Sequence, residues 1–169
     1  MKRFLTLLIV LCLALSLVAC GSAETPKETA GAQYSAADNF SFTYKGTEIT
    51  LHAPAAAIVS ALGEPTKYSE STSCAFEGLD KSYYYGSFYL ETYPKGEEDF
   101  VYGWWFADDS VATAEGVYIG AAQAEVEKAY GADTFNGTNS YVVKKAAGTL
   151  TVILTDGVVS SIQYAINLD

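Results

Sequence analysis

The chain has 169 residues, ten basic and twenty acidic side chains, and a net charge of −10. Its length suits one folded domain, and its acidic balance excludes the basic surface that nucleic-acid binding requires. Arg3 is the only arginine, so the rest of the chain lacks the guanidinium group that best recognises phosphate and carboxylate.

Residues 1–19 have the pattern of a lipoprotein signal peptide. Lys2 and Arg3 precede an apolar run over residues 4–18, which is shorter than the about 20 residues that span a bilayer. Leu17-Val-Ala-Cys20 resembles the bacterial lipobox, in which the cysteine receives a diacylglycerol and the chain is cut before it. We therefore expect acyl chains such as palmitate on Cys20, which would hold the protein on the extracytoplasmic face of the bacterial cell membrane. The alternative is an ordinary signal peptide, or a membrane helix, with a chance cysteine.

This cleavage would change both the charge and the cysteine content of the mature chain. It leaves eight basic against twenty acidic side chains, a net charge of −12, which disfavours anionic partners and leaves neutral and cationic ones open. Cys12 is removed and Cys20 becomes a thioether, so Cys74 is the only remaining thiol and no internal disulfide can form. We expect Cys74 to be a small buried hydrophobe. The alternative is a disulfide between two molecules.

Residues 20–39 are rich in Ala, Gly, Ser, Thr and Glu and have no apolar periodicity, which is typical of a flexible tether. Residues 40–169 then form a single domain with an internal repeat. The segment 49–63 aligns without gaps on 117–131, and each predicts a strand end, a helix of about nine residues and a glycine that ends the helix. Unit one covers about 48–108 and unit two about 116–169.

Strand patterns follow each predicted helix. In unit two they cover residues 141–143, 149–155 and 158–166, with a hairpin turn at Thr155-Asp-Gly157. The matching strands of unit one are expected at 74–76, 83–93 and 100–107, and an extra N-terminal hairpin at 40–44 and 48–51. The expected fold class is therefore α+β: two tandem helix-plus-three-strand antiparallel units form one curved sheet, with both helices on one face and the N-terminal hairpin added.

Two resemblances accompany this pattern. Two helix-plus-meander units, each with a glycine that ends the helix, resemble the fold of the β-lactamase inhibitor protein. The segments Ser73-Cys-Ala-Phe-Glu-Gly-Leu-Asp-Lys81, Thr92-Tyr-Pro94, Asp108-Asp-Ser-Val111 and Thr113-Ala-Glu-Gly-Val-Tyr-Ile-Gly120 resemble motifs of uncharacterised Gram-positive cell-surface lipoproteins. The second resemblance covers most of residues 40–169 and implies no activity. The first concerns the fold alone, and fold does not imply function.

Catalytic chemistry has few candidate residues in this sequence. His52 is the only histidine, and the repeat places Gly120 at its equivalent position. A Cys–His pair of Cys74 with His52 is the one nucleophile arrangement that the residues offer. Glu97-Glu-Asp99 and Asp108-Asp109 lack the spaced ligands of a calcium loop and are better interpreted as solvated turns. We expect no catalytic residue, no metal site and no cofactor.

Aromatic residues gather on one predicted face of unit one. Strand alternation and the repeat alignment pair Trp105 with Ile162 and Trp104 with Ser161, so we expect Trp105 to be buried and Trp104 exposed. An exposed aromatic sheet face is typical of a contact surface. The alternatives are that these are merely good strand residues, or that the N-terminal hairpin covers them. The candidate binding residues are Tyr83, Tyr85, Tyr89, Tyr93, Tyr102, Trp104 and Phe106.

The sequence thus favours a non-enzymatic binding module, anchored to the membrane through the lipid on Cys20, whose ligand is an extracellular protein or a neutral glycan and not nucleic acid. One alternative is a structural or accessory envelope lipoprotein without a soluble ligand. Another is a hydrolase-type enzyme that uses His52 and Cys74. Truncation of the aromatic face would abolish the function of a binder, whereas a change of one titratable residue would abolish that of an enzyme.

Overall fold

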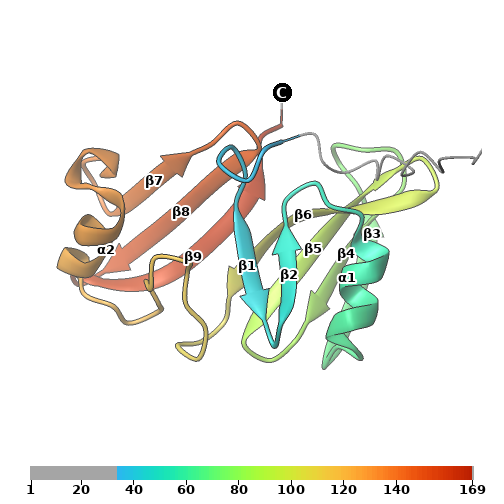
Figure 1. Ribbon diagram of the computed structural model, residues 1–169, viewed down its shortest axis with the longest axis horizontal. Coiled ribbons are helices and arrows are strands. Elements are labelled where there is room, and N and C mark those ends of the chain that lie inside the picture. Colours follow the sequence, from blue (N-terminus) through green and yellow to red (C-terminus); the bar gives the residue numbers. More distant parts are fainter. Residues whose placement is uncertain (1–33, 169) are drawn as a thin grey trace, which may run out of the picture.

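The computed structural model describes residues 34–168, and the predicted signal peptide, Cys20 and most of the predicted tether lie outside this range. The described part is an α+β fold built on a seven-stranded, wholly antiparallel sheet with the order β3-β4-β5-β6-β9-β8-β7 (Figure 1). Within these residues, no helix combines the length and apolar character needed to cross a bilayer.

The N-terminal hairpin consists of β1 (Ser41–Tyr44) and β2 (Thr47–Thr50) and lies in front of the sheet in Figure 1. Lys45 and Gly46 form its turn, and both have positive φ, as a two-residue turn between twisted strands requires. Phe42 and Ile49 are cross-strand partners and are both buried against the sheet. The hairpin thereby covers the middle of one sheet face.

The first helix, α1 (Ala55–Leu62), ends at Gly63. The φ of Gly63 is 78°, a value that residues with a side chain rarely adopt. Four strands follow instead of the three expected: β3 (Lys67–Thr72), β4 (Leu79–Tyr84), β5 (Phe88–Lys95) and β6 (Glu98–Phe106). The predicted strand at 74–76 is a loop, and the predicted strand at 83–93 is divided by a turn that contains Gly86 with φ of 90°. The strongly polar β3 had no apolar alternation that could identify it.

The second helix, α2 (Gln123–Tyr130), ends at Gly131, which also has positive φ. The short 3-10 helix η1 (Ala132–Thr134) leads into β7 (Ser140–Lys144), β8 (Gly148–Thr155) and β9 (Val158–Ile166). The predicted turn between β8 and β9 is confirmed, because Asp156 and Gly157 both have positive φ between paired Thr155 and Val158. Strands β6 and β9 pair at the centre of the sheet.

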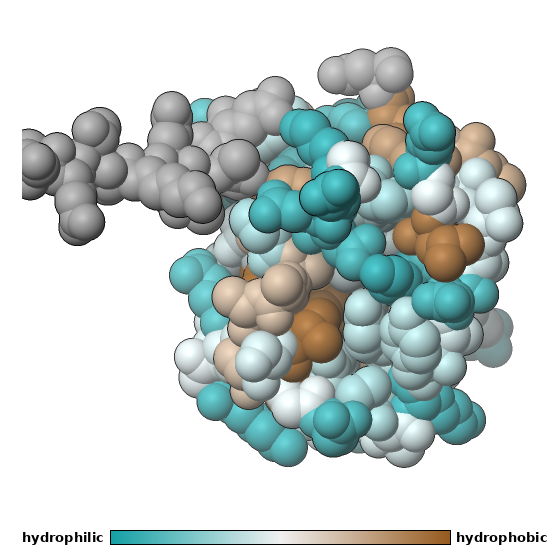
Figure 2. Space-filling model, turned by 90° about the vertical axis from the view of Figure 1, so that its right-hand side faces the viewer, coloured by the Kyte–Doolittle hydropathy of each residue, from teal (hydrophilic) through white to brown (hydrophobic). Residues whose placement is uncertain are grey.

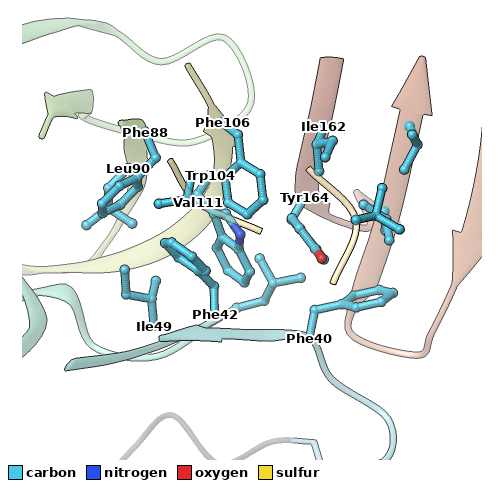
Figure 3. Close-up of a cluster of buried hydrophobic side chains, with 14 of the residues drawn as sticks. Phe40, Phe42, Ile49, Phe88, Leu90, Trp104, Phe106, Val111, Ile162 and Tyr164 are labelled. Carbon is cyan, nitrogen blue, oxygen red and sulfur yellow. The ribbon is translucent and has the colours of Figure 1, made fainter. Parts of the chain in front are cut away.

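The core lies between the sheet and the elements on its covered face, where Trp104 and Tyr164 stack with centroids 4.7 Å apart (Figure 3). Phe42 packs on the other side of Trp104, at 6.2 Å. Both helices contact this same face. Ala55 of α1 belongs to the buried cluster, and Gln123 of α2 donates a hydrogen bond to Tyr141, whose cross-strand partner Val152 is buried there. The opposite face, which we call the outer face, is the one that carries the candidate site.

Candidate functional site

Two bulges decide which side chains reach the outer face. In the pairing of β5 with β6, Thr92 is opposite Val101 and Glu91 is opposite Gly103, so Tyr102 is an extra residue. Ser160 is likewise extra between β8 and β9, because Val159 is opposite Leu154 and Ser161 is opposite Ile153. An extra residue reverses the facing of every side chain beyond it.

The prediction for the two tryptophans is therefore wrong. Trp104 is 0% exposed and Trp105 is the partly exposed one. Phe106, which has the same facing as Trp104, is 4% exposed. Neither Trp104 nor Phe106 can belong to an exposed surface, because the β1–β2 hairpin covers them through Phe42, as one alternative interpretation of the sequence supposed.

Four of the other five candidate residues are also placed differently from the expectation. Tyr83 and Tyr85 have the facing of the covered side, and Tyr85 stacks on buried Phe88 with centroids 5.4 Å apart. Tyr93 is 6% exposed because Phe76 of the β3–β4 loop packs on it at 4.5 Å. Tyr102, in the bulge, packs against the edge of the core. Only Tyr89 among the candidates lies on the open part of the outer face.

A single row of side chains crosses the outer face at the level of Tyr89. Successive strand registers pair Tyr84 with Tyr89, Tyr89 with Trp105, and Trp105 with Gln163. Lys67 of β3 is the partner of Tyr84 at the start of the row. None of the three aromatic residues belongs to the core cluster or packs against it. We call Tyr84, Tyr89 and Trp105 the aromatic ridge.

The rings of the aromatic ridge stack on one another. Tyr84 and Tyr89 have centroids 4.5 Å apart and planes 27° apart, and Tyr89 and Trp105 have centroids 4.8 Å apart and planes 21° apart. These separations match the spacing of adjacent strands, about 4.8 Å, so the rings stand upright on the sheet with their edges outward. The Lys67 ammonium caps the Tyr84 end at 5.7 Å from the ring centroid. Trp105 is the last ring, and its second face is turned toward β9.

A strip of small residues with one carboxylate lies beside the aromatic ridge. Glu91 is flanked in register by Ser82 and Gly103, and Gly103 is followed by Ala165. Burial raises the pKa of the Glu91 carboxyl, the Asp80 charge raises it further, and a hydrogen bond with Ser82 opposes the shift. Glu91 is therefore a half-buried carboxyl group among small neighbours beside the ridge.

The outer face is nearly balanced in charge although the chain is strongly acidic. Among the described residues, the strand registers give this face three basic and two acidic side chains, interspersed with hydroxyl groups. The five are Lys67, Lys95, Lys144, Asp80 and Glu91, whereas Glu98, at the tip of the β5–β6 hairpin, lines a groove on the α1 side. A sheet face with so little net charge attracts or repels an ionic partner only weakly over distance.

His52 and Cys74 do not form the nucleophile arrangement that their residue types allow. The two ring nitrogens of His52 already contact the Tyr93 hydroxyl, at 3.1 Å, and the Ala147 carbonyl, at 3.0 Å. Because a carbonyl only accepts, Nε2 carries the proton and Nδ1 accepts from Tyr93. Burial lowers the pKa of His52. Cys74 is exposed in the β3–β4 loop, so its predicted burial is wrong.

The predicted solvated turns are confirmed for Asp108-Asp109 and Glu97, whereas Glu98 and Asp99 are the first residues of β6. Asp108 accepts hydrogen bonds from the backbone and side chain of Ser110, which lower the pKa of its carboxyl. Asp99 accepts a hydrogen bond from Lys81 at 2.6 Å. Over residues 34–168, no group of three or more His, Cys, Asp or Glu side chains is arranged to hold a metal ion.

Comparisons of this chain with models of protein families, with curated proteins and with solved structures gave no match.

Proposed function

We propose that the mature protein is a lipid-anchored, extracytoplasmic binding module that recognises a neutral glycan through the aromatic ridge. The observation that carries the proposal is the ridge itself: three stacked rings stand on an open sheet face and contribute nothing to the core. Large aromatic side chains on a surface normally mark a contact site, because water hydrates them poorly.

The surroundings of the ridge favour a neutral, hydroxyl-rich ligand. The face carries little net charge in a chain whose mature form would carry −12, so the acidic excess lies elsewhere on the molecule. The partly exposed Trp105 ring offers flat apolar surface to a sugar ring. Gln163, exposed and directly opposite Trp105, and Glu91, beside the ridge, supply hydrogen-bonding groups for hydroxyls.

The test measures retention of the purified full chain on insoluble neutral polysaccharide and on cell-wall glycan. Tyr89→Ala and Trp105→Ala should each weaken retention at least about tenfold, which corresponds to about 1.4 kcal/mol. Tyr118→Ala is the matched control, because Tyr118 is 38% exposed and lies outside the sheet. Equal retention of all variants would refute the ridge as the site. If crosslinking on intact cells captures one protein through Trp105 and no glycan, the ligand of the ridge is a protein and not a glycan.

We further propose that the two halves of the domain are tandem copies of one unit, as in the sequence repeat. In support, each half begins with an eight-residue helix that a positive-φ glycine ends. Each also contains one extra residue, Tyr102 or Ser160, at the corresponding place of its last hairpin. The first half departs from the pattern by its additional strand, β3. A resemblance to the β-lactamase inhibitor fold and to Gram-positive surface lipoproteins is part of the same proposal.

A further inference from the structure

A second candidate site lies on the opposite side of the sheet from the aromatic ridge. It is a groove of about 240 Å³ between α1 and the β5–β6 hairpin. Figure 2 views the molecule from the right-hand side of Figure 1, where α1 lies, and shows apolar residues bordered by hydrophilic ones. The lining residues are Pro54, Ala55, Ala56, Val59, Tyr83, Glu97, Glu98 and Asp99.

One wall of the groove is an unusually apolar helix surface. The sequence of α1, AAAIVSAL, contains no charged residue, and yet only Ala55 is buried. Ala56 is exposed and Val59 is half-buried, so the side of α1 that lines the groove is open to water. When a ligand covers an apolar surface of this kind, the removal of that surface from water favours binding by roughly 25 cal/mol per Å².

The facing wall is acidic and largely without counter-charge. Glu97 and Glu98 are exposed at the tip of the hairpin, and Lys81–Asp99, at 2.6 Å, is the one ion pair among residues 34–168. Lys95 is the register partner of Glu98, but its ammonium lies over the Phe100 ring, 5.6 Å from the centroid. Two carboxylates at the groove are therefore left without an ion-pair partner.

Two tyrosines provide aromatic ring faces at the groove and beside it. Tyr83 lines it, and Tyr68, 50% exposed, packs on Tyr83 with centroids 5.1 Å apart. The Tyr68 hydroxyl donates a hydrogen bond to Glu70 at 2.7 Å, which raises the pKa of Tyr68 to about 12. Aromatic ring faces and carboxylates are the groups that attract an ammonium ion.

We propose that this groove binds a primary ammonium carried on an aliphatic chain of about four or five carbons. The chain would pack on Ala56 and Val59, and the ammonium would donate hydrogen bonds to Glu97 and Glu98. A groove of about 240 Å³ is large enough for such a chain. An anion would be repelled by the carboxylates, and a neutral alcohol would leave their charge uncompensated. A lysine side chain of a protein partner and a free amine share this chemistry.

The test titrates the full chain, purified in detergent, with pentylammonium and with its neutral counterpart pentan-1-ol while backbone amide resonances are recorded. We expect saturable shifts centred on Val59 and Tyr83 with pentylammonium and at least about tenfold weaker binding of pentan-1-ol. The double variant Glu97→Gln/Glu98→Gln should lose at least about tenfold in affinity. Asp109→Asn, which removes an exposed carboxylate elsewhere, should bind as the original chain does.

Three outcomes would overturn the proposal: shifts that do not saturate, equal binding of amine and alcohol, or shifts centred away from α1.

Two further ligands distinguish the sources of the ammonium. The first is Nα-acetyl-lysine methylamide. If it binds about tenfold more tightly than pentylammonium, the natural ligand is a lysine of a protein partner; if the two affinities are equal, the ligand is a free amine. Its Nε-acetylated form should bind at least about tenfold more weakly in either case, and unchanged binding would count against an ammonium site. Because Tyr89→Ala leaves this groove intact, failure here and failure of the ridge proposal are separable.

Discussion

Trp104 and Trp105, in the middle of β6, have opposite environments although they are adjacent. Trp104 is enclosed between Phe42 and Tyr164, whereas Trp105 stacks only on Tyr89 outside the core. The indole nitrogen of Trp104 is buried without a hydrogen-bond partner, which shows that packing rather than polar bonding holds this side chain. The stability of the domain should therefore depend on the first tryptophan and its binding on the second.

We expect Trp104→Ala to lower the free energy of unfolding by about 3–5 kcal/mol, the usual loss for a buried large aromatic. Trp105→Ala should cost about 1 kcal/mol, since it removes one stacking contact outside the core. Urea unfolding of both variants, followed by circular dichroism, measures the difference. A larger loss for Trp105→Ala would mean that the facing of β6 is the reverse of the one described.

His52 gives the domain a defined pH dependence. Its pKa lies below the ordinary value of 6.5, first because of burial and also because of the Lys95 charge, while the Ala147 hydrogen bond opposes the shift. The unfolded chain therefore binds a proton at a higher pH than the native one does, so stability is complete above about pH 6.5 and falls as the pH drops below it. Urea midpoints at pH 7.5 and 5.5 should differ less in His52→Asn, whose side chain tolerates the positive φ at this position. An unchanged difference would assign the effect to other groups.

At the scale of the elements, the sequence predicts the helices well and the strand facing poorly. Both helices end at glycines, Gly63 and Gly131, whose positive φ is a local requirement that the sequence displays. The turn at Asp156-Gly157 is equally local. The bulge at Tyr102 has no such signal, because an extra residue in a strand is determined by pairing with β5 and not by its own neighbours.

That single extra residue accounts for much of the error in the candidate site. A regular β6 would place Trp104 on the outer face, and one additional residue brings Trp105 there instead. Tyr84 was missed for a related reason: the turn at Gly86 divides a stretch that appears as one continuous strand. The existence of an aromatic surface was predictable from composition and alternation, whereas its members required the strand registers.

The junction of β6 and β9 offers a test at this scale. Gly103 and Ala165 are partners there, and a Cβ at Gly103 would overlap the Tyr164 carbonyl oxygen. We expect Gly103→Ala to lower the free energy of unfolding by about 1–3 kcal/mol, because the two central strands must separate. Gly137→Ala is the control, since nothing lies within 4 Å of a Cβ there and only its positive φ of 84° is costly. Equal losses would attribute the effect to backbone conformation alone.

For the molecule as a whole, the sheet separates two kinds of surface. The outer face has little net charge, while the groove beside α1 carries unpaired carboxylates. A protein held at a membrane by its N-terminus could thus engage a neutral polymer and a cationic group from opposite sides. The proposed lipid anchor is what would bring both surfaces to the cell envelope.

Cys20→Ala tests the anchor directly. The variant should lack acyl mass and accumulate as an unprocessed precursor, or be released by another cleavage, because the thiol that receives the diacylglycerol is absent. Intact-mass measurement of the membrane-extracted protein should find the original chain beginning at acylated Cys20. A different N-terminus, or an unmodified Cys20, would contradict the anchoring proposal. Cys74→Ala is the matched control and should leave the mass of the lipid unchanged.

The adjacent tryptophans also make the domain its own optical reporter. The chain has only these two, so each Trp→Phe variant leaves a single indole fluorophore in a known environment. Trp104, sealed from water, should emit at short wavelength and resist quenching by iodide until the domain unfolds. Trp105, at the end of the aromatic ridge, should be quenched readily in the free protein and protected when the ridge is occupied. Core integrity and occupancy of the outer face are thereby readable from two neighbouring side chains without any added label.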